Sequence, residues 1–231
     1  MSEHLVTAYG EELAQLGAEI ARLGGLVEAQ IADAVDSMTR RDVAQAAAVV
    51  AADERIDALQ ADVEHLTLRL IALRQPVAAD LRHAMSAMKI SMQLERCGDL
   101  AKNIAKRGLI LAKGEPVTPF NRSIDRMGKL VVDRLKTVLD AYAAQDVERA
   151  VQVWSRDEEV DEHYNAIFRE LLTYMMGDPR TITPCTHLLF VAKNLERIGD
   201  HATNIAEIVH YEFTGEILAG IRPKFDTLQH G

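Results

Sequence analysis

Apolar side chains recur at intervals of three and four along most of this chain, which is the pattern of helices that bury one face. Leu16, Ile20, Leu23, Val27 and Ile31 make one such stripe near the amino terminus. Glycine, proline and capping residues interrupt the pattern, and the intervals between them predict long helices joined by short connections. The predicted helices cover residues 3–38, 42–75, 77–113, 120–144, 146–176 and 183–213. The fold class is therefore all-α.

One segment occurs twice, and it divides the chain into halves. The first copy reads Leu94-Glu95-Arg96-Cys97-Gly98-Asp99, and 101 positions later the second reads Leu195-Glu196-Arg197-Ile198-Gly199-Asp200. Other matches, 104 positions apart, pair Asp42 with Asp146, Asp53 with Asp157, and Asp57 with Asp161. Short connections make neighbouring helices antiparallel. We therefore expect two tandem antiparallel three-helix bundles related by an internal repeat, with residues 1–114 in the first and 115–231 in the second.

Composition and charge narrow the range of possible functions. The 231 residues carry a formal net charge of −9, and only 5% are aromatic. A nucleic-acid binder needs a basic face, so that class is disfavoured. No run of about eighteen apolar residues occurs, so we expect contact with a membrane only through a partner. The two cysteines, Cys97 and Cys185, have no metal-binding spacing, and reduced thiols in a cytoplasmic protein are expected.

Acidic side chains in both copies of the repeated segment, together with acidic pairs on the preceding predicted helices, form two rows. Pairs spaced by four residues lie on one face of a helix, and counting from the turn at Gln75-Pro76 places the predicted second and third helices' pairs at one level. Close carboxylates repel, and oxygen ligands suit Mg, Ca, Mn or Fe better than Zn or Cu. We expect Fe, Mn, Mg or Zn ions at these rows. The candidate ligands are Asp53, Asp57, Glu95, Asp99, Asp157, Asp161, Glu196 and Asp200, with Asn103 and Asn204 as possible additional ligands.

The same rows also have an ordinary explanation. Acidic pairs four residues apart are common on solvated helix faces, where basic side chains neutralise them. Arg55, Arg96, Lys102 and Arg197 are near enough in sequence to do so. Both explanations stay open from the sequence.

Two weaker signals lie outside the rows. His65, His83, His187 and His201 have no ligand spacing, so we expect them at the surface or at interfaces. Arg74 and Arg82 flank Pro76, where the start of the predicted third helix offers a possible anion site.

Several motifs together carry a resemblance. They are Arg74-Gln75-Pro76-Val77-Ala78, Asp80-Leu81-Arg82, both copies of the repeated segment, and Thr214-Gly215-Glu216. In these the sequence resembles the PhoU family of phosphate-signalling proteins over nearly its whole length. The resemblance implies two three-helix bundles and acidic motifs that hold multinuclear iron or other metal ions in some members. It also implies a cytoplasmic negative regulator of phosphate uptake and of the phosphate-starvation response.

We therefore expect a non-catalytic adaptor. Its partners would be the ATPase subunit of the phosphate ABC transporter and a sensor histidine kinase, and a homodimer is expected. The alternatives are a metal-dependent enzyme, either a phosphatase or an oxygen-handling protein, and a helical scaffold without metal. No Walker A segment, nucleophile elbow or HExxH motif supports an enzyme.

Overall fold

The computed structural model describes residues 2–218, and these form seven α-helices and two single-turn 3-10 helices without a strand. The first half contains α1 (Ser2–Arg40), α2 (Val43–Arg74) and α3 (Ala79–Leu111). The second contains α4 (Asn121–Ala144), α5 (Val147–Ser155), α6 (Glu158–Gly177) and α7 (Ile182–Thr214), with 3-10 turns at Thr118–Phe120 and Pro179–Thr181. The predicted all-α fold of two tandem bundles is confirmed. None of the described helices is long and apolar enough to cross a membrane.

Helix boundaries follow the local signals closely. Asp42 caps α2 by accepting a hydrogen bond from the Gln45 amide, and Asp146 caps α5 in the same way through Arg149. α2 ends at Arg74, and Gln75 adopts a left-handed conformation before the proline.

The helix predicted over 146–176 is wrong in one respect, because it is broken. α5 ends at Ser155, α6 begins at Glu158, and Arg156 and Asp157 form a turn between them. The Asp157 side chain is buried, and its carboxylate accepts a hydrogen bond from Thr203 on α7. The break thus coincides with an acidic side chain that turns inward to a polar partner, which the apolar periodicity does not register.

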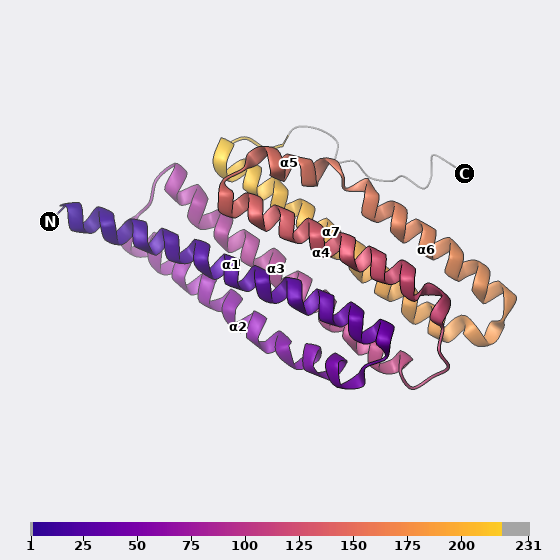
Figure 1. Ribbon diagram of the computed structural model, residues 1–231. Coiled ribbons are helices and arrows are strands. Elements are labelled where there is room, and N and C mark those ends of the chain that lie inside the picture. Colours follow the sequence, from indigo (N-terminus) through magenta and orange to yellow (C-terminus); the bar gives the residue numbers. More distant parts are fainter. Residues whose placement is uncertain (1, 219–231) are drawn as a thin grey trace.

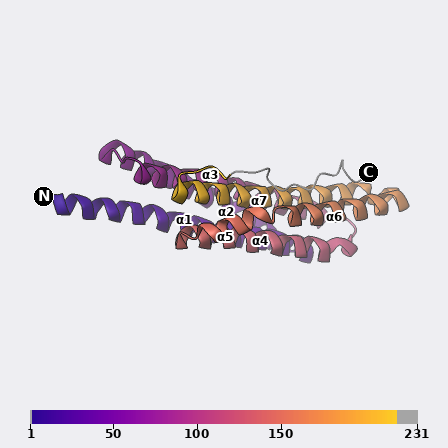
Figure 2. The ribbon, with the colours of Figure 1, turned by 90° about the horizontal axis from the view of Figure 1, so that it is seen from above.

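The two halves lie side by side, and they share one hydrophobic core. α1, α3, α4 and α7 pack against one another in the centre, with α2 on one flank and α5 and α6 on the other (Figure 1). Seen from above, the molecule is elongated and flat (Figure 2). Fully buried Leu94 and Leu195 belong to the same continuous cluster of apolar side chains. The division at residue 114 stays a prediction.

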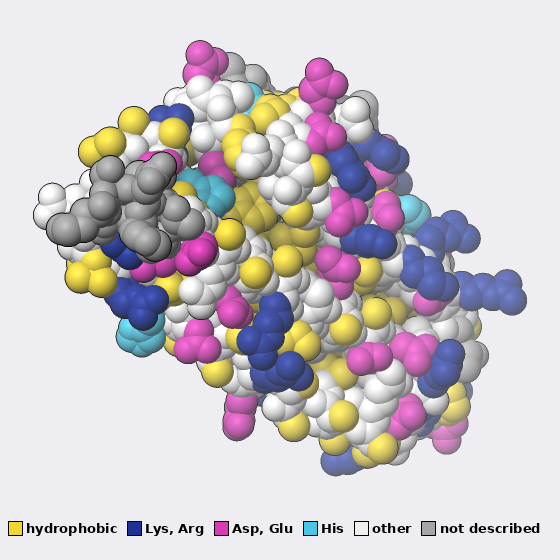
Figure 3. All heavy atoms as spheres, turned by 60° about the vertical axis from the view of Figure 1, so that its left-hand side comes forward, with side chains coloured by type: hydrophobic (Ala, Val, Ile, Leu, Met, Phe, Trp, Pro, Cys, Tyr) yellow, Lys and Arg dark blue, Asp and Glu magenta, His cyan; other side chains and the backbone are white. Residues whose placement is uncertain are grey.

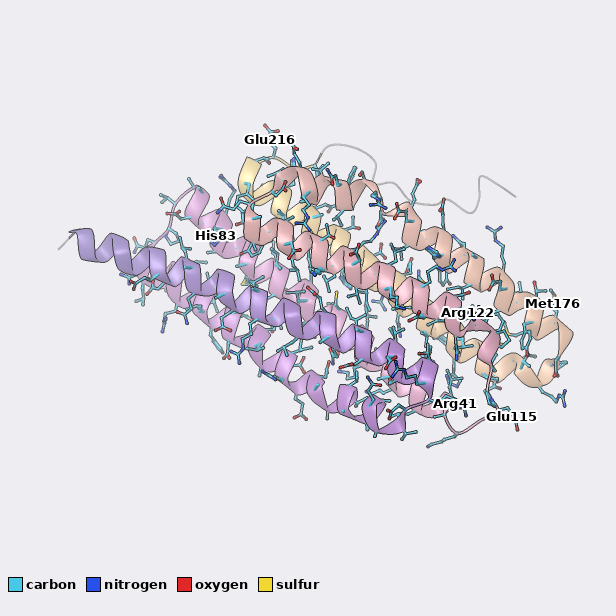
Figure 4. All side chains as sticks on the ribbon, in the orientation of Figure 1. Arg41, His83, Glu115, Arg122, Met176 and Glu216 are labelled. Carbon is cyan, nitrogen blue, oxygen red and sulfur yellow. The ribbon has the colours of Figure 1, made fainter. Side chains whose placement is uncertain are left out.

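Two glycines let α1 and α4 approach closely. A β-carbon at Gly24 would lie 2.5 Å from Cδ1 of Leu139, and one at Gly128 would lie 2.9 Å from Cγ2 of Val35. Gly24 and Gly128 are repeat partners, as are Val35 and Leu139, so the contact occurs twice with the halves exchanged. At the end of α1, Arg41 donates hydrogen bonds to the carbonyls of Ala112 and Gly114, close to Glu115 in the connection between the halves (Figure 4).

Candidate functional site

The first acidic row lies between α2 and α3 and contains a lysine. Asp53 is 4% exposed, and the Lys102 ammonium bonds both Asp53 and Asp99, the latter at 2.6 Å. Arg96 lies 3.5 Å from Glu95 and 3.7 Å from Asp99 on the outer side. The lysine therefore joins the acidic side chains of both helices.

The four predicted acids of this row lie close enough to affect one another. Burial raises the pKa of Asp57, and the Asp53 charge adds to that rise. Burial also raises the pKa of Glu95, with Asp99 adding to the effect, whereas the hydrogen bond from Lys102 lowers the pKa of Asp99. Asp99 is thus stabilised as an anion. Asp57 and Glu95 gain a preference for the protonated form.

The second row lies where α5, α6 and α7 meet. Thr203 donates to Asp157 at 2.7 Å, and the guanidinium of Arg134 on α4 lies 4.0 Å from the same carboxylate. Glu196 accepts a bond from Lys193 at 2.7 Å. Burial raises the pKa of Glu196 despite that bond, and the charges of Asp200 and Asp161 raise it further. The structure therefore also gathers the second set of acids.

The cations beside Asp53 and Asp157 come from repeat positions that do not correspond to each other. The repeat partner of Lys102 is Thr203, and the repeat partner of Gln30 on α1 is Arg134 on α4. Gln30 and Arg134 are both buried, at 4% and 5% exposure. Asp53 in the first row thus has its cation, Lys102, on α3, and the neutral amide of Gln30 is on α1. Asp157 in the second row has its cation, Arg134, on α4, and the neutral hydroxyl of Thr203 is on α7.

These placements bear on metal binding. Among residues 2–218, no group of three or more histidine, cysteine or acidic side chains is arranged to hold a metal ion. In the first row the Lys102 ammonium occupies the space between Asp53 and Asp99. As placed, these residues do not fit a metal, because a cation is already bonded to the candidate ligands. Binding of Fe, Mn, Mg or Zn stays a prediction, and at the first row it requires Lys102 to move away.

The possible additional ligands lie elsewhere. Asn103 is exposed on α3, and Asn204 donates to Gln93 across the boundary between the halves at 3.2 Å. Gln93 also bonds His201 at 2.8 Å. Asn204 and His201 thus contribute to the packing of α3 against α7.

Histidines take part in three of the polar contacts at the α3–α7 boundary, namely His201 with Gln93, His83 with Glu212 and His187 with Arg107. The start of α3 meets the end of α7 through His83 and Glu212, and the end of α3 meets the start of α7 through Arg107 and His187. The two helices are therefore antiparallel. The expectation of surface or interface histidines holds for all four, because His83, His187 and His201 lie at this boundary and His65 is exposed.

Sequence reasoning missed Gln30, Arg134, Thr203 and Glu212. The first three lie outside the repeated motif. The repeat pairs Lys102 with Thr203 and Gln30 with Arg134. Each pair matches a cationic side chain with a neutral one, so aligning the two halves would have drawn attention to these residues. Glu212 has no such signal, because its partner His83 lies 129 residues away.

Comparison with known proteins gives a consistent result. A family model described as "PhoU domain" matches residues 20–108 and 124–209. The chain is 68% identical over 228 residues to the "Phosphate-specific transport system accessory protein PhoU homolog" of Caulobacter vibrioides, with 99% of each chain covered. It is 35% identical over 216 residues to the Escherichia coli accessory protein PhoU, with 94% of this chain and 89% of that one covered.

Solved structures match as well. A crystal structure of PhoU from Pseudomonas aeruginosa superposes with a TM-score of 0.87 at 36% identity, covering 90% of this chain and all of the other. The phosphate transport system regulatory protein PhoU from Streptococcus pneumoniae superposes with a TM-score of 0.84 at 30% identity, covering 91% and 99%.

Proposed function

Because the chain belongs to the PhoU domain family, we propose that it is a cytoplasmic negative regulator of phosphate uptake and of the phosphate-starvation response. It acts as an adaptor between the ATPase subunit of the phosphate ABC transporter and a sensor histidine kinase. The observation that carries the proposal is the similarity to phosphate transport accessory proteins over 99% of the chain.

The arrangement of the acidic rows supports an adaptor over an enzyme. A metal-dependent enzyme needs an ion with an open coordination position beside a substrate pocket. Here Lys102 bonds two of the first row's carboxylates, and Thr203 and Arg134 face the acid Asp157 of the second. Internally neutralised rows stabilise a fixed helix arrangement, which is what a docking scaffold requires.

The net charge is compatible with the proposed partners. A chain with a net charge of −9 suits basic surfaces on other proteins. Association with the membrane is proposed to occur only through these partners, and the protein is proposed to act as a homodimer.

Deletion of the gene tests the regulatory part. Phosphate-starvation genes should stay expressed in phosphate-rich medium, and the intact gene supplied in trans should restore repression. Normal repression in the deletion strain would contradict the proposal.

A pull-down tests the adaptor part. Tagged protein added to membranes from phosphate-replete cells should retain the ATPase subunit and the kinase, whereas membranes that lack the transporter should not yield the ATPase. The enzyme alternative predicts instead that purified protein loaded with Fe, Mn, Mg or Zn turns over phosphoesters or peroxide.

A further inference from the structure

A cavity of about 610 Å³ opens at the end of the molecule where α3 begins and α4 and α7 end. Residues from both halves line it, among them Leu13, Arg82, His83, Tyr142, Glu212 and Phe213. Figure 4 places His83 and Glu216 at this end and Met176 at the opposite one. In the space-filling view of this side, a histidine borders a hollow with a hydrophobic floor (Figure 3). The volume is within the range of about 300–1,000 Å³ typical of small-molecule sites.

A partly buried contact between His83 and Glu212 forms one wall of the cavity. Nδ1 of His83 lies 2.5 Å from Oε1 of Glu212, whose side chain is almost fully buried. The hydrogen bond to Glu212 raises the pKa of His83, which favours the imidazolium form. His83 therefore already supplies the counter-charge for Glu212.

Two buried polar atoms of the lining lack a partner. Oε2 of Glu212 and the hydroxyl of Tyr142 make no hydrogen bond within the described part of the chain, although the two residues are only 4% and 6% exposed. Leaving such groups unpaired in a protein interior is unfavourable. Both atoms have almost no solvent-exposed surface, so a bound molecule would reach them after a small shift of the surrounding side chains. A hydroxyl group fits both, since it can donate to Glu212 and accept from Tyr142. Glu212 does not require an ammonium group from the ligand, because His83 already supplies its counter-charge.

The outer part of the cavity favours an anion. Within the described part of the chain, no side chain caps the first turn of α3. This turn opens onto the cavity at Ala79, and a helix start is electropositive. Arg82 also lines the cavity and uses its Nε to donate to the backbone carbonyl of Glu212 at 3.3 Å. Asp80 stands on the rim, but its side chain is exposed and can point to solvent.

We propose that this cavity binds the phosphate monoester of a small polyhydroxyl compound. The phosphate lies at Arg82 and the start of α3, and the hydroxyl groups bond Glu212 and Tyr142. The apolar side chains of Leu13 and Phe213 surround the carbon skeleton. Because the lining comes from both halves, the bound molecule would hold the α3–α7 boundary together at this end.

Calorimetric titration of the full chain with ribose 5-phosphate tests the proposal, with ribose and inorganic phosphate as comparison ligands. Ribose 5-phosphate should bind more tightly than either comparison ligand, since only it reaches both parts of the cavity. Tyr142→Phe removes one hydroxyl and keeps the ring, so it should weaken binding by about fivefold to tenfold. Arg82→Gln should weaken binding of ribose 5-phosphate and leave that of ribose unchanged.

Tyr174→Phe is the matched control, because Tyr174 is 41% exposed and outside the cavity. It should bind ribose 5-phosphate like the parent protein. A melting temperature of Tyr142→Phe at or above that of the parent would establish that this variant is folded. The proposal is overturned if ribose 5-phosphate does not bind at millimolar concentration, if inorganic phosphate binds equally well, or if Tyr142→Phe binds like the parent.

Discussion

Replacing Lys102 by threonine, the residue at its repeat position, should destabilise the first half. The change removes the ammonium that bonds both Asp53 and Asp99 and leaves the Asp53 carboxylate without a cation. Removing one partner of a fully buried ion pair costs about 3–5 kcal/mol. The Lys102 and Asp99 side chains are 21% and 33% exposed, so solvent screening reduces this to about 2–4 kcal/mol. For a chain of this size the melting temperature should fall by roughly 5–15 °C.

The second half supplies the change that should compensate. Arg134 lies 4.0 Å from Asp157, and its repeat partner Gln30 occupies the matching buried position beside the first row. Gln30→Arg in the Lys102→Thr background should therefore place a guanidinium near Asp53 and recover part of the lost stability. In the parent background, Gln30→Arg should destabilise, because it adds a second buried cation next to Lys102.

Urea unfolding of the four proteins measures this coupling as a double-mutant cycle. Lys129→Thr is the control, since Lys129 pairs with Asp125 at 2.7 Å but is 77% exposed, and its loss should change stability little. The reasoning fails if Lys102→Thr unfolds like Lys129→Thr. It also fails if Gln30→Arg has the same effect in both backgrounds.

Two further predictions concern the boundary between the halves. The pKa of His83 is raised by Glu212, so the pair contributes stability below about pH 6.5 that is lost as pH rises through the folded pKa. The melting temperature should therefore fall as pH rises from mildly acidic to alkaline, and His83→Gln should flatten this fall. An unchanged pH profile of the variant would contradict the prediction. Leu94→Asp buries a charge in the shared core, so hydrogen exchange should accelerate in α7 as well as in α3; faster exchange in α3 alone would indicate separable halves.

The helices could be predicted from the sequence because each one depends on local signals. The capping aspartates Asp42 and Asp146 and the break before Pro76 fix helix ends through contacts a few residues away. The level of the acidic rows could also be predicted, since short connections and a fixed rise per residue determine which residues of antiparallel neighbours meet. Both rows were indeed brought together at the expected depth.

Lys102 lies three residues after Asp99 and was among the basic residues named from the sequence. Other partners were harder to predict, because they come from a third helix or from the opposite half. Arg134 reaches the second row from α4, and Glu212 meets His83 across 129 residues of sequence. No periodicity reports such contacts. The break at Asp157 has the same origin, since its carboxylate turns away from the helix axis toward partners on α4 and α7.

Lys102 and Gln30 of the first half correspond to Thr203 and Arg134 of the second, so the cation beside the buried aspartate lies on a different helix in each half. A buried carboxylate such as Asp53 or Asp157 tolerates burial only beside a cation, but the bundle offers two helices from which that cation can come. A repeat that has diverged can therefore change both positions while keeping a positive charge beside the buried aspartate of each row. The two halves keep the same helix arrangement with different charge placement. The acidic motif alone therefore does not determine whether a row binds a metal ion. The side chains that face the row from the first and last helices of each half must be considered as well.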